Sequence, residues 1–237
     1  MAGYRKPFLL LLLILPLLSA CGSDEADTCG GVALGLDGTW FGALEDDQGS
    51  LFTLEWQVCG DRITRKRLSG PDYGLTGRLV REGGGVYVAY LSDGSTSRLL
   101  TAPGLNHGLM VNDFFDFALI QRGAQILPQY RFSDLDGSWS GRHARLLPSA
   151  TRLQSTLAWC GSGFCSLERA DGEIAQAEFL DFNRDFGLYL GDYTDGWSNQ
   201  GIAGALMSPD RQVLGTYTCT AGYQSPADCG FGIYWRR

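Results

Sequence analysis

A short motif that occurs twice in this chain restricts its fold more than any other feature. Leu36-Asp37-Gly38-Thr39-Trp40-Phe41-Gly42 recurs as Leu135-Asp136-Gly137-Ser138-Trp139-Ser140-Gly141. Four further segments recur in the same order: Thr53–Trp56 as Thr156–Trp159, Val86–Gly94 as Leu188–Gly196, Ala102–Gly104 as Ser208–Asp210, and Phe117–Arg122 as Phe231–Arg236. The order never reverses, so we infer that the chain arose by internal duplication.

Each copy has the size of an ordinary domain. We place the first copy at residues 35–124 and the second at residues 125–237. The connecting segment is short and carries Ile126, Leu127, Tyr130 and Phe132, which is too apolar for a flexible linker. We therefore expect the two copies to pack against each other.

The pattern within each copy is typical of β-strands. Phe52, Leu54, Trp56 and Val58 alternate with polar residues, which is the period of a half-buried strand. Turn residues recur about every ten positions, a spacing typical of an antiparallel barrel or sandwich. The sequence predicts an all-β chain of two tandem antiparallel modules, each with about eight strands connected up and down.

Each copy opens with Gly-x-Trp and closes on a strand that ends in arginine. This resembles the pattern of calycins, the lipocalin-like and avidin-like β-barrels. The resemblance implies a tryptophan that packs beneath an arginine at one barrel end, which pairs Trp40 with Arg122 and Trp139 with Arg236. A guanidinium on an indole face contributes roughly 0.5–2 kcal/mol. The expected fold is two calycin-like barrels, and no ligand residues are carried over.

The N-terminus has the layout of a secretory signal. Arg5 and Lys6 precede the apolar run Phe8–Leu18, which is shorter than the ~20 residues that span a bilayer. Leu18-Ser19-Ala20-Cys21 follows and resembles the lipobox of bacterial lipoproteins. The resemblance implies removal of residues 1–20 and a lipid on Cys21.

Residues 21–34 are then expected to form the lipidated cysteine and its tether. The lipid places the protein in the bacterial cell envelope, attached to a membrane through Cys21. Gly22 after the cysteine is compatible with sorting to an outer membrane.

Seven cysteines are present, at positions 21, 29, 59, 160, 165, 219 and 229. If Cys21 carries lipid, six remain, and an oxidising exported compartment favours three disulfides. Six cysteines allow 15 connectivities. Up-and-down connectivity brings sequence neighbours together, so we favour three pairs: Cys29–Cys59, Cys160–Cys165 and Cys219–Cys229.

The chain is acidic, with a formal net charge of −7. Removal of Arg5 and Lys6 with the signal leaves 17 basic and 26 acidic residues, a charge of −9. Phosphate contacts need clustered Lys and Arg, so this balance argues against nucleic-acid binding.

Candidate catalytic and metal-binding residues are few. His107 and His143 are the two histidines, and no Gly-x-Ser-x-Gly elbow accompanies them, so we expect surface histidines and no enzyme activity. Asp181, Asn183 and Asp185 have the oxygen spacing of a calcium loop. However, Phe186 stands where such a loop needs glycine, and a polar hairpin explains the spacing as well. No cofactor is expected.

Two further sets of side chains bear on recognition. Arg62, Arg65, Lys66 and Arg67 form a basic run that either contacts an anionic lipid or glycan or forms a solvated strand face. The bulky strand residues Trp56, Trp159, Tyr87 and Tyr189 are expected to fill the barrel interiors. Recognition would then fall to outer surfaces and loops.

The sequence favours a non-enzymatic binding or protein-interaction module of the cell envelope. A lipocalin-like carrier of a small apolar ligand is the first alternative, and an envelope hydrolase with an unrecognised site is the second. The possible partners are an envelope protein or a small apolar ligand.

Overall fold

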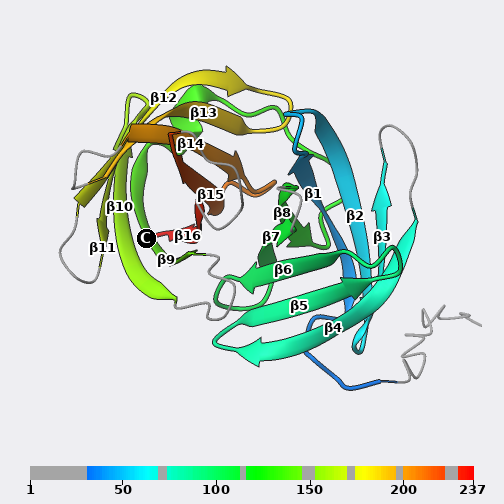
Figure 1. The fold of residues 1–237 in the computed structure, drawn as a ribbon. Helices are drawn as coiled ribbons and strands as arrows, with labels where there is room; N and C mark the ends of the chain where they lie inside the picture. The colour runs from blue at the N-terminus through cyan, green and yellow to red at the C-terminus, as the bar shows by residue number, and fades with distance from the viewer. Residues whose placement is uncertain are drawn as a thin grey trace, which may run out of the picture.

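The prediction of two all-β modules in tandem is confirmed. The computed structural model describes residues 31–68, 74–112, 116–145, 153–169, 174–195, 200–221 and 229–237. Within these residues the chain forms two closed antiparallel barrels of eight strands each, which lie side by side (Figure 1). In each barrel the strands follow chain order, and the last strand pairs with the first.

Barrel 1 comprises strands β1 to β8. Their bounds are β1 Gly38–Glu45, β2 Leu51–Cys59, β3 Arg62–Arg67, β4 Leu75–Gly83, β5 Val86–Leu91, β6 Thr96–Thr101, β7 His107–Asn112 and β8 Phe117–Arg122. The turns between them carry glycines with positive φ, among them Gly49, Gly60 and Gly94.

Barrel 2 comprises strands β9 to β16. A short 3-10 helix, η1 at Phe132–Leu135, leads into it. The strand bounds are β9 Gly137–Arg145, β10 Gln154–Gly161, β11 Phe164–Arg169, β12 Ile174–Asn183, β13 Leu188–Thr194, β14 Gln200–Met207, β15 Val213–Thr220 and β16 Cys229–Arg236.

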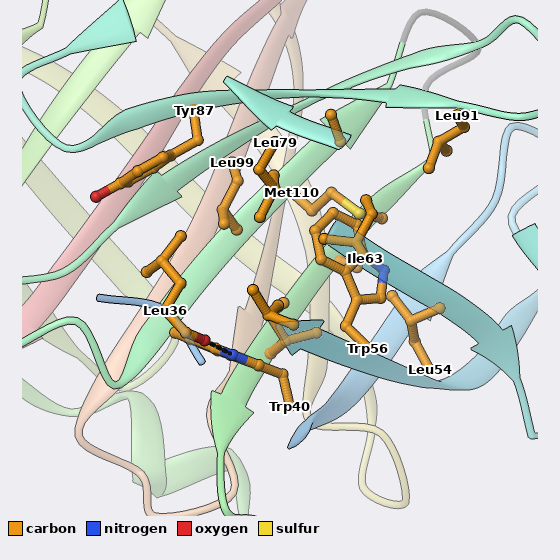
Figure 2. Packing of buried hydrophobic residues seen from close by; sticks show 14 of the residues in the cluster. Leu36, Trp40, Leu54, Trp56, Ile63, Leu79, Tyr87, Leu91, Leu99 and Met110 are labelled. Carbon is orange, nitrogen blue, oxygen red and sulfur yellow. Dashed lines mark hydrogen bonds between the residues drawn. The ribbon is translucent and has the colours of Figure 1, made fainter. Parts of the chain in front are cut away.

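The interior of barrel 1 is filled by large side chains. Trp40 on β1 pairs with Trp56 on β2, and both indoles are buried. Leu54, Tyr87 and Met110 belong to the same buried cluster (Figure 2). Because alternate residues of a strand share one face, the period-two pattern of β2 places its apolar residues inside.

One of the five sequence alignments between the copies is wrong by one residue. Trp139 pairs with Ala158 in barrel 2, so Ala158 takes the position that Trp56 has in barrel 1. Trp159 therefore points outward and is 43% exposed. The expectation that Trp159 fills a barrel interior is wrong, because a shift of one residue moves a strand side chain to the opposite face.

A third apolar core joins the two barrels. It is built from outward-facing residues of both, including Leu100, Leu109, Phe117, Leu119, Leu188, Leu206, Phe231 and Ile233. Gly215 on β15 permits the close approach, because a Cβ there would lie 2.6 Å from Leu109 Cδ1. Strands β7 and β8 accordingly contact strands β14, β15 and β16.

In the part of the chain that the structure describes, no helix has the length and apolar character needed to cross a membrane.

Candidate functional site

Glu45 is an acidic residue buried where the two barrels meet. It is the last residue of β1, and its register partners are Leu51 on β2 and Phe117 on β8. β1 is apolar on both faces before this point, with Phe41 to Leu44 all buried. Glu45 itself is only 8% exposed. An ionisable residue at such a position marks a candidate site.

A cleft opens beside Glu45, and we call it the interbarrel cleft. Its volume is about 440 Å³. Barrel 1 and its β1–β2 turn supply Glu45, Asp46, Asp47, Gln48, Gly49 and Phe117, and barrel 2 supplies Leu190, Gly191, Ile202, Ala203, Tyr217, Cys219 and Phe231. One rim is thus acidic and the opposite wall is apolar and aromatic.

Burial raises the pKa of Glu45 to about 7, because removal from water disfavours the charged carboxylate. A hydrogen bond with the Tyr217 side chain opposes this effect, and the charge of Asp46 adds to it. Glu45 Oε2 has no hydrogen-bond partner among the described residues. A buried oxygen in this state is a free acceptor for a ligand.

Tyr217 is held in place by its neighbours on both barrels. Its ring contacts the Phe117 ring edge-on, with centroids 4.9 Å apart. Gly204 on β14 leaves room for it, because a Cβ there would lie 2.2 Å from the Tyr217 ring. The hydroxyl that bonds Glu45 therefore comes from a positioned side chain.

Polar contacts between the barrels fix the walls of the cleft relative to each other. His107 Nε2 lies 2.9 Å from Asp210 Oδ2, and the Asp210 amide donates to Gln121 Oε1 at 3.0 Å. Arg142 Nη1 donates to the Gly84 carbonyl at 2.8 Å. His107 thus joins the two barrels and is not the free surface residue that its sequence context indicates.

The surroundings of Asp210 favour its charged form. Burial alone would raise its pKa, but hydrogen bonds from Ser208 and Gln212 and the proximity of His107 lower the pKa below its usual value. His143 is half-buried on β9. The structure does not bring the two histidines into one site, since one lies on β7 and the other on β9.

The structure brings each repeated tryptophan and arginine together at one barrel end. The Arg122 guanidinium lies 5.0 Å from the Trp40 ring centroid, and that of Arg236 lies 4.4 Å from the Trp139 ring centroid. The indole nitrogens donate to the carbonyls of Leu36 and Leu135 at 2.8 and 3.0 Å.

The aspartate of the repeated motif has the same role in both copies. Asp37 Oδ1 accepts the Gly60 amide, and Asp136 Oδ1 accepts the Ser162 amide at 2.9 Å. Each aspartate thereby ties the chain before the first strand to the next hairpin. The repeated motif therefore has a structural role: it closes one end of each barrel.

Two of the expected disulfides are present, Cys160–Cys165 and Cys219–Cys229. Each joins directly paired residues of adjacent strands. Cys59 is also disulfide-bonded. Cys29 and Cys21 lie outside the described residues, as does the segment 1–20, so the lipidation prediction stays a prediction.

The calcium-like oxygens are used within their own hairpin. Asn183 Oδ1 accepts the amides of Asp185 and Phe186 at 3.1 and 3.3 Å, and Asp181 Oδ1 accepts the Phe182 amide at 2.7 Å. Across the described ranges, no group of three or more His, Cys, Asp or Glu side chains is placed to hold a metal ion.

The basic run on β3 is divided between two faces. Arg65 points into barrel 1 and forms a buried ion pair with Asp116 at 2.6 Å. Arg62 is exposed on the other face, where Lys66 pairs across to Glu55 on β2. Arg62, Arg65 and Lys66 therefore do not form one patch, because successive strand residues alternate in direction.

The interiors of the two barrels differ in filling. Alignment by strand register sets Ala158, Ala205 and Thr216 of barrel 2 against Trp56, Leu99 and Met110 of barrel 1. These smaller side chains leave an apolar cavity of about 30 Å³ in barrel 2. The same register sets Leu167 against Arg65, so the ion pair of barrel 1 has no counterpart there.

Sequence reasoning missed Glu45 and Tyr217. The available signal was an acidic residue directly after four consecutive apolar or small residues, Phe41 to Leu44. The sequence predicts Asp46–Gly49 as a turn, which is what the structure shows, but a turn prediction does not reveal that barrel 2 lies across a cleft from it.

No protein-family model and no curated protein matches the sequence. Two solved structures are similar to parts of it. A mutant of LTBP1 in complex with leukotriene C4 shares 15% identity over 48% of this chain and 75% of its own, with a TM-score of 0.34. A mutant of the vaccine antigen transferrin binding protein B from Haemophilus parasuis shares 10% identity over 77% of this chain and 52% of its own, with a TM-score of 0.33.

Proposed function

We propose that this chain is a non-enzymatic binding module that takes its ligand in the interbarrel cleft. The observation that carries the proposal is the buried Glu45 carboxyl, with Oε2 unpaired among the described residues, beside an apolar cleft of about 440 Å³. Ligand sites are typically clefts of ~300–1,000 Å³ that combine apolar walls with few polar groups, and they often lie between domains.

The packing of the barrels supports this location. Barrel 1 is filled by Trp40, Trp56 and the buried side chains of the same cluster. The contacts between β7, β8 and β14 to β16 keep both walls of the cleft in place without a ligand. A preformed site loses less conformational entropy on binding.

The proposal also places the module on the cell envelope. The lipid on Cys21 would attach it to a membrane, and the tether before β1 would hold the barrels in the aqueous phase. Each buried methylene of an acyl chain contributes ~0.8 kcal/mol to such attachment. No reaction is assigned to the cleft: its carboxyl and hydroxyl groups bind and orient.

Purification of the full chain from its native envelope, followed by mass spectrometry of bound small molecules, tests the location of the site. Ile202→Trp fills the cleft from its barrel 2 wall, and Leu180→Trp is the matched control at an exposed position that does not line the cleft. A molecule found with the wild type and Leu180→Trp should be absent from Ile202→Trp. Its retention in Ile202→Trp would show that the cleft is not the site.

A second candidate function is a carrier that holds a small apolar molecule inside barrel 2. The replacement of the Trp56 position by Ala158, with the apolar cavity beside it, favours this reading. The cavity is smaller than the ~150 Å³ that admits benzene, so a carrier would have to widen barrel 2 on binding. If the carrier interpretation is correct, the bound molecule found in the same experiment should be absent from Ala158→Leu and still present in Ile202→Trp.

A further inference from the structure

The ligand class of the interbarrel cleft follows from the charges and rings that line it. We propose, building on the function proposed above, that the cleft selects a protonated amine carried on an aromatic or similar apolar body, with the Glu45 carboxylate as its counter-ion.

The charges that line the cleft favour a cation. Glu45, Asp46 and Asp47 lie on one rim, and no Lys, Arg or His is among the described residues that line the cleft. A carboxylate or phosphate ligand would meet three acids and no cation there. A cation would instead be attracted by the three acids. A charge-assisted hydrogen bond to a carboxylate is about twice as strong as a neutral one.

The second step identifies Glu45 as the recognising acid. Asp46 Oδ1 already accepts the amides of Gln48 and Ser50 in its own turn, at 3.0 and 2.8 Å. Asp47 is exposed. Glu45 is buried, and its Oε2 has no partner among the described residues. An amine N–H would supply the donor that this oxygen lacks, and an alcohol would supply it without the charge.

The third step concerns the body of the ligand. The rings of Phe117, Tyr217 and Phe231 stand together at the cleft, with Phe117 at 4.9 Å from Tyr217 and 6.3 Å from Phe231 between centroids. An aromatic group packs favourably against such rings, and their faces attract a nearby cation. Arylalkylamines combine both features.

The fourth step is a dependence on pH. The charged or titratable groups that face Glu45 are Asp46 and Asp47 on the β1–β2 turn and Tyr217 on β15. The pKa of Glu45 is raised to about 7, so acidification neutralises it while the amine stays protonated. Amine affinity should therefore fall about tenfold for each pH unit below 7 and level off above it.

Calorimetric titration of the purified full chain with three matched probes tests the proposal. The probes are 2-phenylethylamine, 2-phenylethanol and 3-phenylpropanoate. At pH 8 the amine should bind at least about tenfold more tightly than the alcohol, and the carboxylate most weakly. Glu45→Gln should bring the amine and the alcohol to within about twofold. The matched acid-to-amide change Asp185→Asn, at an exposed position that does not line the cleft, should keep the preference.

Tyr217→Phe provides a second arm that keeps Glu45 intact. Loss of the hydroxyl hydrogen bond raises the pKa of Glu45, so the pH at which amine binding weakens should move upward. An unchanged pH dependence in Tyr217→Phe, or an amine preference that survives in Glu45→Gln, would overturn the assignment of Glu45 as counter-ion.

The outcomes separate this inference from the proposed function. If the alcohol or the carboxylate binds as tightly as the amine, and Ile202→Trp abolishes that binding, the cleft is the site but the amine class is wrong. If none of the probes binds and Ile202→Trp changes nothing in the native purification, both the class and the site are wrong.

Discussion

Tyr217 on barrel 2 is hydrogen-bonded to the carboxyl of Glu45 on barrel 1. This bond spans the line along which the two copies meet, and it leaves Glu45 Oε2 unpaired among the described residues. The duplicated modules are thus connected at a point where an ionisable group is buried. The pair belongs to the assembled molecule, because Glu45 comes from barrel 1 and Tyr217 from barrel 2 and both line the interbarrel cleft.

Glu45→Gln should change the pH dependence of stability. The folded pKa of about 7 exceeds the ordinary value of 4.5, so the folded protein keeps a proton that the unfolded chain releases between these values. The free energy of unfolding should therefore fall as the pH rises from 4.5 to 7, by about 3 kcal/mol in total from this group. Chemical denaturation at pH 5 and pH 8 should show that contribution in the wild type and in Asp47→Asn, and its absence in Glu45→Gln. Equal pH dependence in all three proteins would contradict the assigned pKa.

Tryptophan replacements should separate buried from exposed indoles. Trp40→Ala and Trp139→Ala should each destabilise the protein by about 3–5 kcal/mol, because each leaves a cavity at a closed barrel end. Trp159→Ala is the matched control and should cost less than about 1 kcal/mol, since its side chain is outside. Denaturant unfolding followed by circular dichroism measures all three. A large loss for Trp159→Ala would argue against the register of β10.

Arg65 and Asp116 should behave as a buried pair. Removal of one partner, as in Asp116→Asn, leaves an uncompensated charge inside barrel 1 and should cost about 3–5 kcal/mol. The double change Arg65→Leu with Asp116→Asn should recover much of that loss, because barrel 2 has Leu167 at the position of Arg65. The free energies of unfolding of the two single variants and the double variant complete the cycle. Additive losses would mean that the pair is not coupled.

Cys21→Ala should block lipid attachment. Without the thiol, the precursor should keep residues 1–20 and lose its membrane attachment by lipid. Intact-mass measurement and detergent-phase partitioning check this outcome. A Cys21→Ala protein that is still cleaved after Ala20 and still enters the detergent phase would exclude the lipoprotein interpretation.

Much of the fold could be read from the order of residues. The repeated Leu-Asp-Gly-x-Trp motif and the closing arginines determine two similar barrels, because each motif closes a barrel through contacts within about one copy. The two short disulfides were predictable for the same reason, since each joins neighbouring strands. Local contacts of this kind leave a periodic signature in the sequence.

The sequence was a weaker guide to which face of a strand each side chain occupies. Trp56 and Trp159 occupy similar sequence contexts, yet one is inside and the other is outside. The alternation of a strand makes every assignment depend on a register that two adjacent strands determine together. The same uncertainty hid the division of Arg62, Arg65 and Lys66 between two faces.

The interbarrel cleft was decided by tertiary structure alone. Glu45 and Tyr217 are 172 positions apart in the chain, and the cleft that both line has walls from both barrels. Each of these walls belongs to the outer surface of one barrel, and neither has a sequence motif that predicts contact with the other. Burial raises the pKa of Glu45, and the hydrogen bond that opposes this rise comes from Tyr217 on the other barrel.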